Sequence, residues 1–190
     1  MPDRNQWNAA AVRMFDDVYS FVRTGPRKHG DWRHDLPPIL TREVEDPRGW
    51  VELDWDKDSE ERTEGNTAFP FKNLTVEQLT GLYEIEPEPA AHLLVTLLSE
   101  WFTIKGVWNF EEREEQLLSD ARTLVARYGP DSACYTPSGL ARTTKHPDFF
   151  RESDRNSVSG DIPFTDLMGD LGLIVVSDTE VGVFWAFNDE

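Results

Sequence analysis

The chain has 190 residues and is strongly acidic, because 36 Asp and Glu residues against 19 Lys and Arg residues give a formal net charge of −17. This length is typical of one domain, and contents of 38% hydrophobic and 12% aromatic residues exclude a disordered acidic tail. The charge excludes ordinary binding to nucleic-acid phosphates and favours attraction of a basic protein, although solubility is an equally good explanation. Residues 43–116 hold 19 of the acidic residues and 6 of the basic ones, so the acidity lies in the middle of the chain.

The sequence also indicates whether targeting signals or membrane segments are present. Charges interrupt every apolar stretch of residues 1–21, so we expect no signal peptide. The longest strongly apolar stretch, residues 90–102, is far shorter than the roughly 20 residues that span a membrane. The single cysteine, Cys134, excludes an internal disulfide and suits a small buried residue in a reducing compartment. We therefore expect a cytoplasmic protein with no membrane segment and no cofactor.

The first quarter of the chain begins with an amphipathic pattern. Apolar residues at helical spacing predict a helix over residues 6–24, and a Gly-Pro pair ends it. Residues 26–46 show neither the helical nor the strand period and are expected to form a loop. Over residues 50–56, apolar and acidic residues alternate, which predicts a half-buried strand with Trp55 on the apolar side and a carboxylate face opposite.

Three helices are expected in the central part of the chain. The capping-box sequence of Thr75 and Gln78 predicts a short helix over residues 75–84. A proline starts a second helix over residues 89–102, which is apolar around much of its circumference and is expected to be central. A third helix, over residues 109–128, has one apolar face, a capping-box-like start and a Gly-Pro stop.

The last third of the chain predicts a β-hairpin. Residues 131–161 indicate an ordered loop with one short strand, and residues 163–170 can form one or two helical turns. Two apolar runs within residues 172–187 flank a four-residue loop, and their nearly continuous apolar character indicates strands covered on both faces. Because strands and helices do not alternate, we expect a single α+β domain over residues 1–190, with helices packed on a small, mostly antiparallel sheet. The residues expected to be almost fully buried are Trp101, Leu117, Leu124, Ile174 and Phe184.

An acidic segment in the middle of the chain is the best candidate for a binding site. The candidate partner-binding residues are Trp50, Glu52, Asp54, Asp56, Asp58, Glu60 and Glu61. On an extended strand the first four carboxylates project to one side, about 7 Å apart. Such a row repels itself and becomes favourable when arginines or lysines of a partner interleave with it, while Trp50 is a candidate anchor. The alternative is a solvated edge strand.

Metal binding is considered for a loop that contains two histidines. His29, Asp31, His34 and Asp35 offer imidazole and carboxylate ligands that suit a divalent metal. Arginine and lysine residues interleave with them and would repel a cation, so we expect a solvated loop with no metal. The acidic run from Asp54 lacks the glycine and the glutamate that a calcium loop requires at its sixth and twelfth positions.

Two functions from different classes remain open. The first is an acidic intracellular protein that docks and neutralises a basic protein partner, for example a toxin-immunity protein, with mimicry of DNA as a special case. The second is a small enzyme with a dispersed active site in the loop over residues 131–161, where Tyr135, Ser138, His146 and Asp148 are the candidate residues. The standard catalytic motifs are absent from the sequence, which favours the binding protein.

Overall fold

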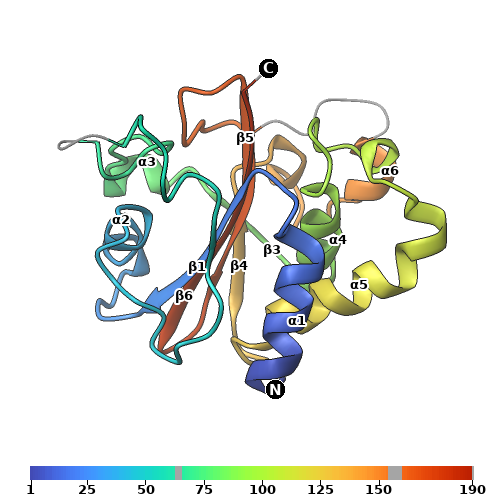
Figure 1. The fold of residues 1–190 in the computed structure, drawn as a ribbon, viewed down its shortest axis with the longest axis horizontal. Coiled ribbons are helices and arrows are strands. Elements are labelled where there is room, and N and C mark those ends of the chain that lie inside the picture. The colour runs from blue at the N-terminus through green and yellow to red at the C-terminus, as the bar shows by residue number, and fades with distance from the viewer. Residues whose placement is uncertain (63–65, 154–159, 190) are drawn as a thin grey trace.

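A six-stranded antiparallel sheet forms the centre of the fold, and helices lie on both of its faces (Figure 1). The computed structural model describes residues 1–62, 66–153 and 160–189. The strands are β1 (Ser20–Pro26), β2 (Leu53–Asp54), β3 (Tyr83–Ile85), β4 (Ala133–Thr136), β5 (Gly169–Val176) and β6 (Glu180–Asn188), in the spatial order β2-β1-β6-β5-β4-β3. The α-helices are α1 (Arg4–Phe15), α2 (Leu36–Leu40), α3 (Val76–Leu79), α4 (Pro87–Thr96), α5 (Phe110–Ala126) and α6 (Phe149–Ser153). The α+β fold and the C-terminal hairpin of β5 and β6 are confirmed.

The sheet carries a hydrophobic core on each face. Along β6, Phe184 and Ala186 belong to a core shared with α1, α4 and α5. Val183 and Trp185 belong to a second core, shared with α2 and α3. In Figure 1, α1, α4 and α5 lie on one side of the sheet and α2 and α3 on the other. Burial on both faces explains the nearly continuous apolar sequence of the hairpin, as the sequence predicted.

A glycine in β6 allows the end of α5 to reach the sheet. A Cβ atom at Gly182 would lie 1.9 Å from the hydroxyl oxygen of Tyr128. That hydroxyl shares a 2.7 Å hydrogen bond with Oγ1 of Thr24, the residue of β1 that pairs with Gly182. Only a residue without a side chain therefore lets Tyr128 lie directly on β1 and β6.

The predicted helix over residues 6–24 is wrong in its second half. α1 ends at Phe15, and the chain then turns into β1. Phe21 packs in one core and Val22 in the other, so β1 is buried on both faces and lacks the alternation of a half-buried strand. Its apolar residues also fit helical spacing, and antiparallel pairing with the distant β6 decides in favour of the strand.

The predicted strand over residues 50–56 is reduced to the two residues of β2. The chain turns directly after β2, where the N–H of Lys57 donates to the carbonyl oxygen of Asp54 at 3.3 Å. The turn inverts the expected alternation, since Trp55 is 59% exposed and Asp56 is only 7% exposed. A local turn has therefore replaced the sheet pairing that the sequence pattern indicated.

The central helices are shorter than predicted. The capping box of Thr75 and Gln78 forms and starts α3, but the chain leaves the helix after one turn and enters β3. α4 ends at Thr96, so Trp101 lies beyond its buried face. The predicted burial of Trp101 is wrong, because 55% of this residue is exposed.

α5 agrees with the helix predicted over residues 109–128. The predicted N-terminal cap is wrong, because Asn109 has a left-handed backbone (φ 49°) and its side chain accepts no capping hydrogen bond. The apolar face is confirmed by its buried residues, which pack in the core shared with α1 and α4. The residues found buried as predicted are Leu117, Leu124, Ile174, Phe184 and Cys134.

Two connecting segments also differ from prediction. The loop expected over residues 26–46 contains α2 and a 3-10 turn. The helical turns expected over residues 163–170 do not form, because the carboxylate of Asp170 accepts the backbone N–H groups of Phe164 and Thr165 and holds the segment in a loop. The buried side chain of Asp170 thus fixes the backbone of a segment whose local sequence did not determine its conformation.

Candidate functional site

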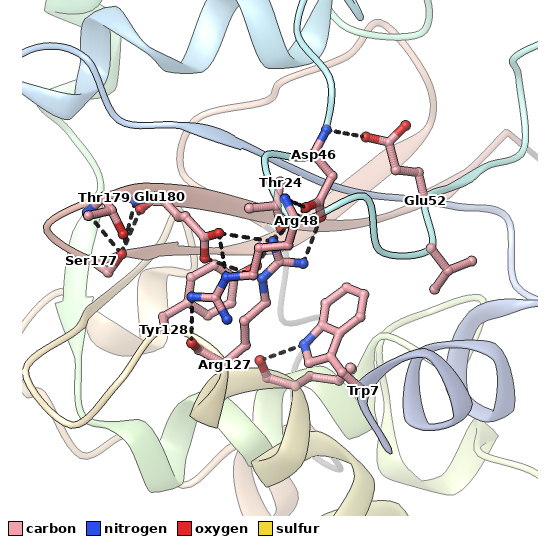
Figure 2. Close-up of polar contacts among 12 residues, drawn as sticks. Trp7, Thr24, Asp46, Arg48, Glu52, Arg127, Tyr128, Ser177, Thr179 and Glu180 are labelled. Atoms are coloured by element: carbon pink, nitrogen blue, oxygen red, sulfur yellow. Dashed lines mark hydrogen bonds and ion pairs between the residues drawn. The ribbon is translucent and has the colours of Figure 1, made fainter. Parts of the chain in front are cut away.

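A buried arginine joins distant parts of the chain. Arg127, directly after α5, is 0% exposed, and its two terminal nitrogens donate to the two carboxylate oxygens of Asp46, both at 2.7 Å (Figure 2). Arg127 also pairs with Glu180 at 3.1 Å, and Arg48 pairs with the same carboxylate at 2.8 Å. The guanidinium of Arg127 lies 4.4 Å from the ring centroid of Trp50. We call the four charged residues the buried ionic cluster.

The buried ionic cluster links three segments that are distant in the sequence. Its two arginines and two carboxylates balance in charge, and hydrogen bonds offset the loss of hydration. Burial lowers the pKa of Arg127, but the hydrogen bonds to Asp46 and Glu180 outweigh this effect and leave the pKa above its ordinary value. The cluster therefore holds the loop around Asp46 against the end of α5 and the start of β6.

The predicted row of carboxylates is not a single face, so that geometry is wrong. Glu52 forms an ion pair with Arg23 at 2.7 Å, and Asp54 forms one with Arg42, with Nη2 and Oδ1 2.8 Å apart. Asp56 is buried, and its Oδ1 accepts a hydrogen bond from a tyrosine hydroxyl at 3.2 Å. Three of the four carboxylates of the row are thus engaged within the protein, because the turn after β2 directs them to different neighbours.

The remaining candidate residues lie in two environments. Asp58, Glu60 and Glu61 are exposed on the turn after β2. Trp50 is half-buried and packs on the buried ionic cluster, so most of its ring is engaged internally. The exposed tryptophan of this region is Trp55, which the sequence pattern placed on the apolar side of a strand.

A pocket of about 280 Å³ opens where the chain enters β1, leaves α4 and leaves β6. Its three carboxylates come from three segments, with Asp17 before β1, Glu100 after α4 and Asp189 after β6. Within the described residues, none of the three forms an ion pair, and no lysine or arginine lines the pocket. We call it the strand-end pocket. The lining residues that matter for its chemistry are Asp17, Tyr19, Leu98, Glu100, Phe187 and Asp189.

Tyr19 connects the strand-end pocket to the acidic segment that the sequence singled out. Its hydroxyl donates to Oδ1 of Asp56 at 3.2 Å, and its ring centroid lies 6.0 Å from that of Trp55. Burial raises the pKa of Tyr19, and the carboxylates of Asp56, Asp189 and Glu61 raise it further. Asp56 therefore contacts a lining residue of the pocket, and Glu61 acts electrostatically on the same residue, although the predicted row is absent.

Exposed apolar side chains occur on segments that border the strand-end pocket. Trp55 packs on Tyr19, and Trp101 directly follows a lining residue of the pocket. Met168, which is also exposed, precedes the first residue of β5, and that residue pairs with the lining residue Asn188. Exposed tryptophan beside an acidic pocket is typical of a binding surface. Sequence reasoning missed this surface because it placed Tyr19 in a helix and both tryptophans in the core.

The candidate enzyme residues are not assembled into one site. Within the described residues, no hydrogen bond joins any two of the side chains of Tyr135, Ser138, His146 and Asp148. Ser138 is buried, and its hydroxyl accepts the backbone N–H two residues further on. Asp148 accepts a backbone N–H of α6. Residues 154–159 of the same loop lie outside the described residues.

The histidine loop is held together by a buried carboxylate. Asp35 accepts both the backbone N–H of His29, at 3.1 Å, and its ring Nδ1, at 2.6 Å. The ring of His34 lies 5.6 Å from that of His29, while Asp31 pairs with Arg33. In the part of the chain that the structure describes, no three His, Cys, Asp or Glu side chains are placed to hold a metal ion.

Comparisons with known proteins assign no family to this chain. No protein-family model, no curated protein and no solved structure matches it. Across residues 1–62, 66–153 and 160–189, no helix is both long and apolar enough to cross a membrane. The chemistry of the surface is therefore the basis for a functional proposal.

Proposed function

We propose that this chain is an acidic, cytoplasmic binding protein that docks a basic protein partner and neutralises it, as a toxin-immunity protein does. The observation that carries the proposal is the strand-end pocket. There, three carboxylates without an ion-pair partner among the described residues lie beside exposed tryptophan.

The electrostatics of the strand-end pocket favour a cationic partner. Asp17, Glu100 and Asp189 lie around one small cavity, and the carboxylates of Asp56 and Glu61 lie near its Tyr19 wall. Like charges around one cavity repel one another, and a bound cation replaces this repulsion with charge-assisted hydrogen bonds. The net charge of −17 also attracts a basic protein over a longer range and accelerates its association.

The residues of the acidic segment predicted from the sequence have two different roles in this proposal. Asp58, Glu60 and Glu61 are exposed and extend the acidic surface from the strand-end pocket along the turn after β2. Glu52 and Asp54 hold the fold through their own ion pairs, and the partner arginines largely offset their charges. A basic partner that covers both the strand-end pocket and the turn after β2 would contact aromatic and acidic groups together.

The experiment begins with the basic protein that co-purifies with this chain at low salt. Replacing Asp17 and Asp189 together with lysine reverses the field of the strand-end pocket, and both positions are exposed, so the fold is preserved. We expect calorimetric titration to show binding weakened by about 2 kcal/mol, the scale of lost charge pairs at an interface. The association rate of the wild-type protein should fall as ionic strength rises, because screening weakens the attraction.

The matched control carries the same change in charge at another place. Asp58→Lys with Glu60→Lys alters the turn after β2, whose side chains do not line the pocket. Binding lost only in this control would move the interface to the turn. If no basic protein is retained at low salt, or if the affinity of both double variants equals that of the wild-type protein, the proposed function is wrong.

A further inference from the structure

The size of the strand-end pocket limits what can enter it. Its volume of about 280 Å³ lies just below the range of about 300–1,000 Å³ that is usual for small-molecule sites. A single long side chain of a protein partner suits this volume better than a cofactor does. Within the described residues, the charged groups that line the pocket are carboxylates, so that side chain must be a cation.

A buried carboxylate that is hydrogen-bonded to a lining residue of the pocket strengthens this requirement. Asp56 is 7% exposed, and its Oδ2 has no hydrogen-bond partner among the described residues. Its Oδ1 accepts the hydroxyl hydrogen of Tyr19, a residue that lines the pocket. The donated hydrogen leaves the lone pairs of the Tyr19 oxygen free to accept a donor from a ligand. Tyr19 and Asp56 thus present one more acceptor, backed by negative charge, beside the three lining carboxylates.

We propose that the occupant of the strand-end pocket is an arginine side chain of the basic partner, selected over lysine, an inference that rests on the proposed function. The acceptors lie on Asp17, Tyr19, Glu100 and Asp189, which come from three separate segments of the chain. A guanidinium carries five N–H donors in a planar fork and can reach several such acceptors at once. An ammonium group acts as a compact point charge and satisfies fewer of them.

The aromatic groups at the strand-end pocket also discriminate between the two cations. The rings of Tyr19 and Trp55 are neighbours, and Trp55 is largely exposed. Arginine stacks on aromatic faces through its flat, weakly hydrated guanidinium, whereas lysine keeps its hydration more strongly. Hydrogen bonding and stacking therefore both favour arginine, while net charge alone would treat the two equally.

The test uses two peptides of equal charge, hexa-arginine and hexalysine, titrated calorimetrically into the full chain at low ionic strength. We expect hexa-arginine to bind about tenfold more tightly. The pocket variant Asp17→Asn with Asp189→Asn should lose this preference. The control variant Glu111→Gln with Glu114→Gln makes the same change in charge on the exposed side of α5, which does not line the pocket, and should keep this preference. Thermal melting of each variant verifies the fold.

Each other outcome has a definite meaning. Equal affinities for the two peptides that both fall in the pocket variant would overturn arginine selection and leave docking of a basic partner in place. A preference that persists in the pocket variant would overturn the pocket as its origin. Binding of neither peptide would overturn the inference, and the proposed function would then depend on the co-purified partner alone.

Discussion

Asp56 imposes an electrostatic cost on the folded chain. Burial raises its pKa, the hydrogen bond from Tyr19 lowers it, and the nearby carboxylates of Asp54 and Glu61 raise it, so that the net change is upward. A raised pKa means that the folded state disfavours the charged form that predominates at neutral pH. The residue therefore lowers stability while it adds negative charge beside the strand-end pocket.

Replacing Asp56 with asparagine should stabilise the free protein. We expect Asp56→Asn to raise the free energy of unfolding near pH 7 by about 1 kcal/mol, because the buried charge is removed while the Tyr19 hydroxyl keeps an acceptor. The cost of the charge is fully present above the raised pKa and absent below the ordinary pKa of aspartate. Urea unfolding should thus show the difference shrinking as the pH falls toward about 4. Asp58→Asn, at an exposed position, serves as the control, and a loss of stability in Asp56→Asn would contradict this account.

Arg127 should be among the most sensitive single positions of the fold. Arg127→Met leaves the buried carboxylates of Asp46 and Glu180 with only Arg48 nearby, so we expect unfolding free energy to fall by about 3–5 kcal/mol. The same substitution at Arg122, whose half-exposed side chain pairs with an exposed carboxylate, should change it by less than about 1 kcal/mol. Similar losses in the two variants, measured by urea unfolding, would show that burial of the cluster contributes little.

At the scale of elements, α5 joins the core of one face to the buried ionic cluster. Leu124 is fully buried on this helix, and Leu124→Ala should lower the free energy of unfolding by about 2–5 kcal/mol. Glu114→Ala, on the exposed side of the same helix, should change it by no more than about 0.5 kcal/mol. Chemical denaturation of both variants measures the difference, and a loss below about 1 kcal/mol for Leu124→Ala would mean that the surrounding core rearranges around the missing side chain.

At the scale of the whole molecule, elements with local signals were predictable from the sequence. α5 has a continuous apolar face and a Gly-Pro stop, and the hairpin of β5 and β6 has two apolar runs around a short turn. β1 had no such signal, because its residues fit two periodicities and only the distant β6 selects the strand. The turn after β2 could not be predicted either, because the alternating sequence continues past the residue at which sheet pairing stops.

The candidate site was predictable only in its chemistry. The sequence singled out acidic residues, and Asp56 and Glu61 do lie near the strand-end pocket. The three carboxylates that line the pocket, Asp17, Glu100 and Asp189, come from segments 83 and 89 residues apart in the chain, which no local pattern connects. Only the folded sheet brings the ends of α4, β1 and β6 together.

The pairing of β1 with β6 has a consequence for the time at which the protein can fold. The register joins Ser20 to Ala186, so the centre of the sheet combines strands from opposite ends of the sequence. During synthesis β1 leaves the ribosome long before its partner exists, and one edge of β5 also remains open until β6 arrives. Contacts this distant along the chain form late and slowly. The sheet can therefore close only after β6 has been made, and until then the edge of β1 that later pairs with β6 stays open to other contacts.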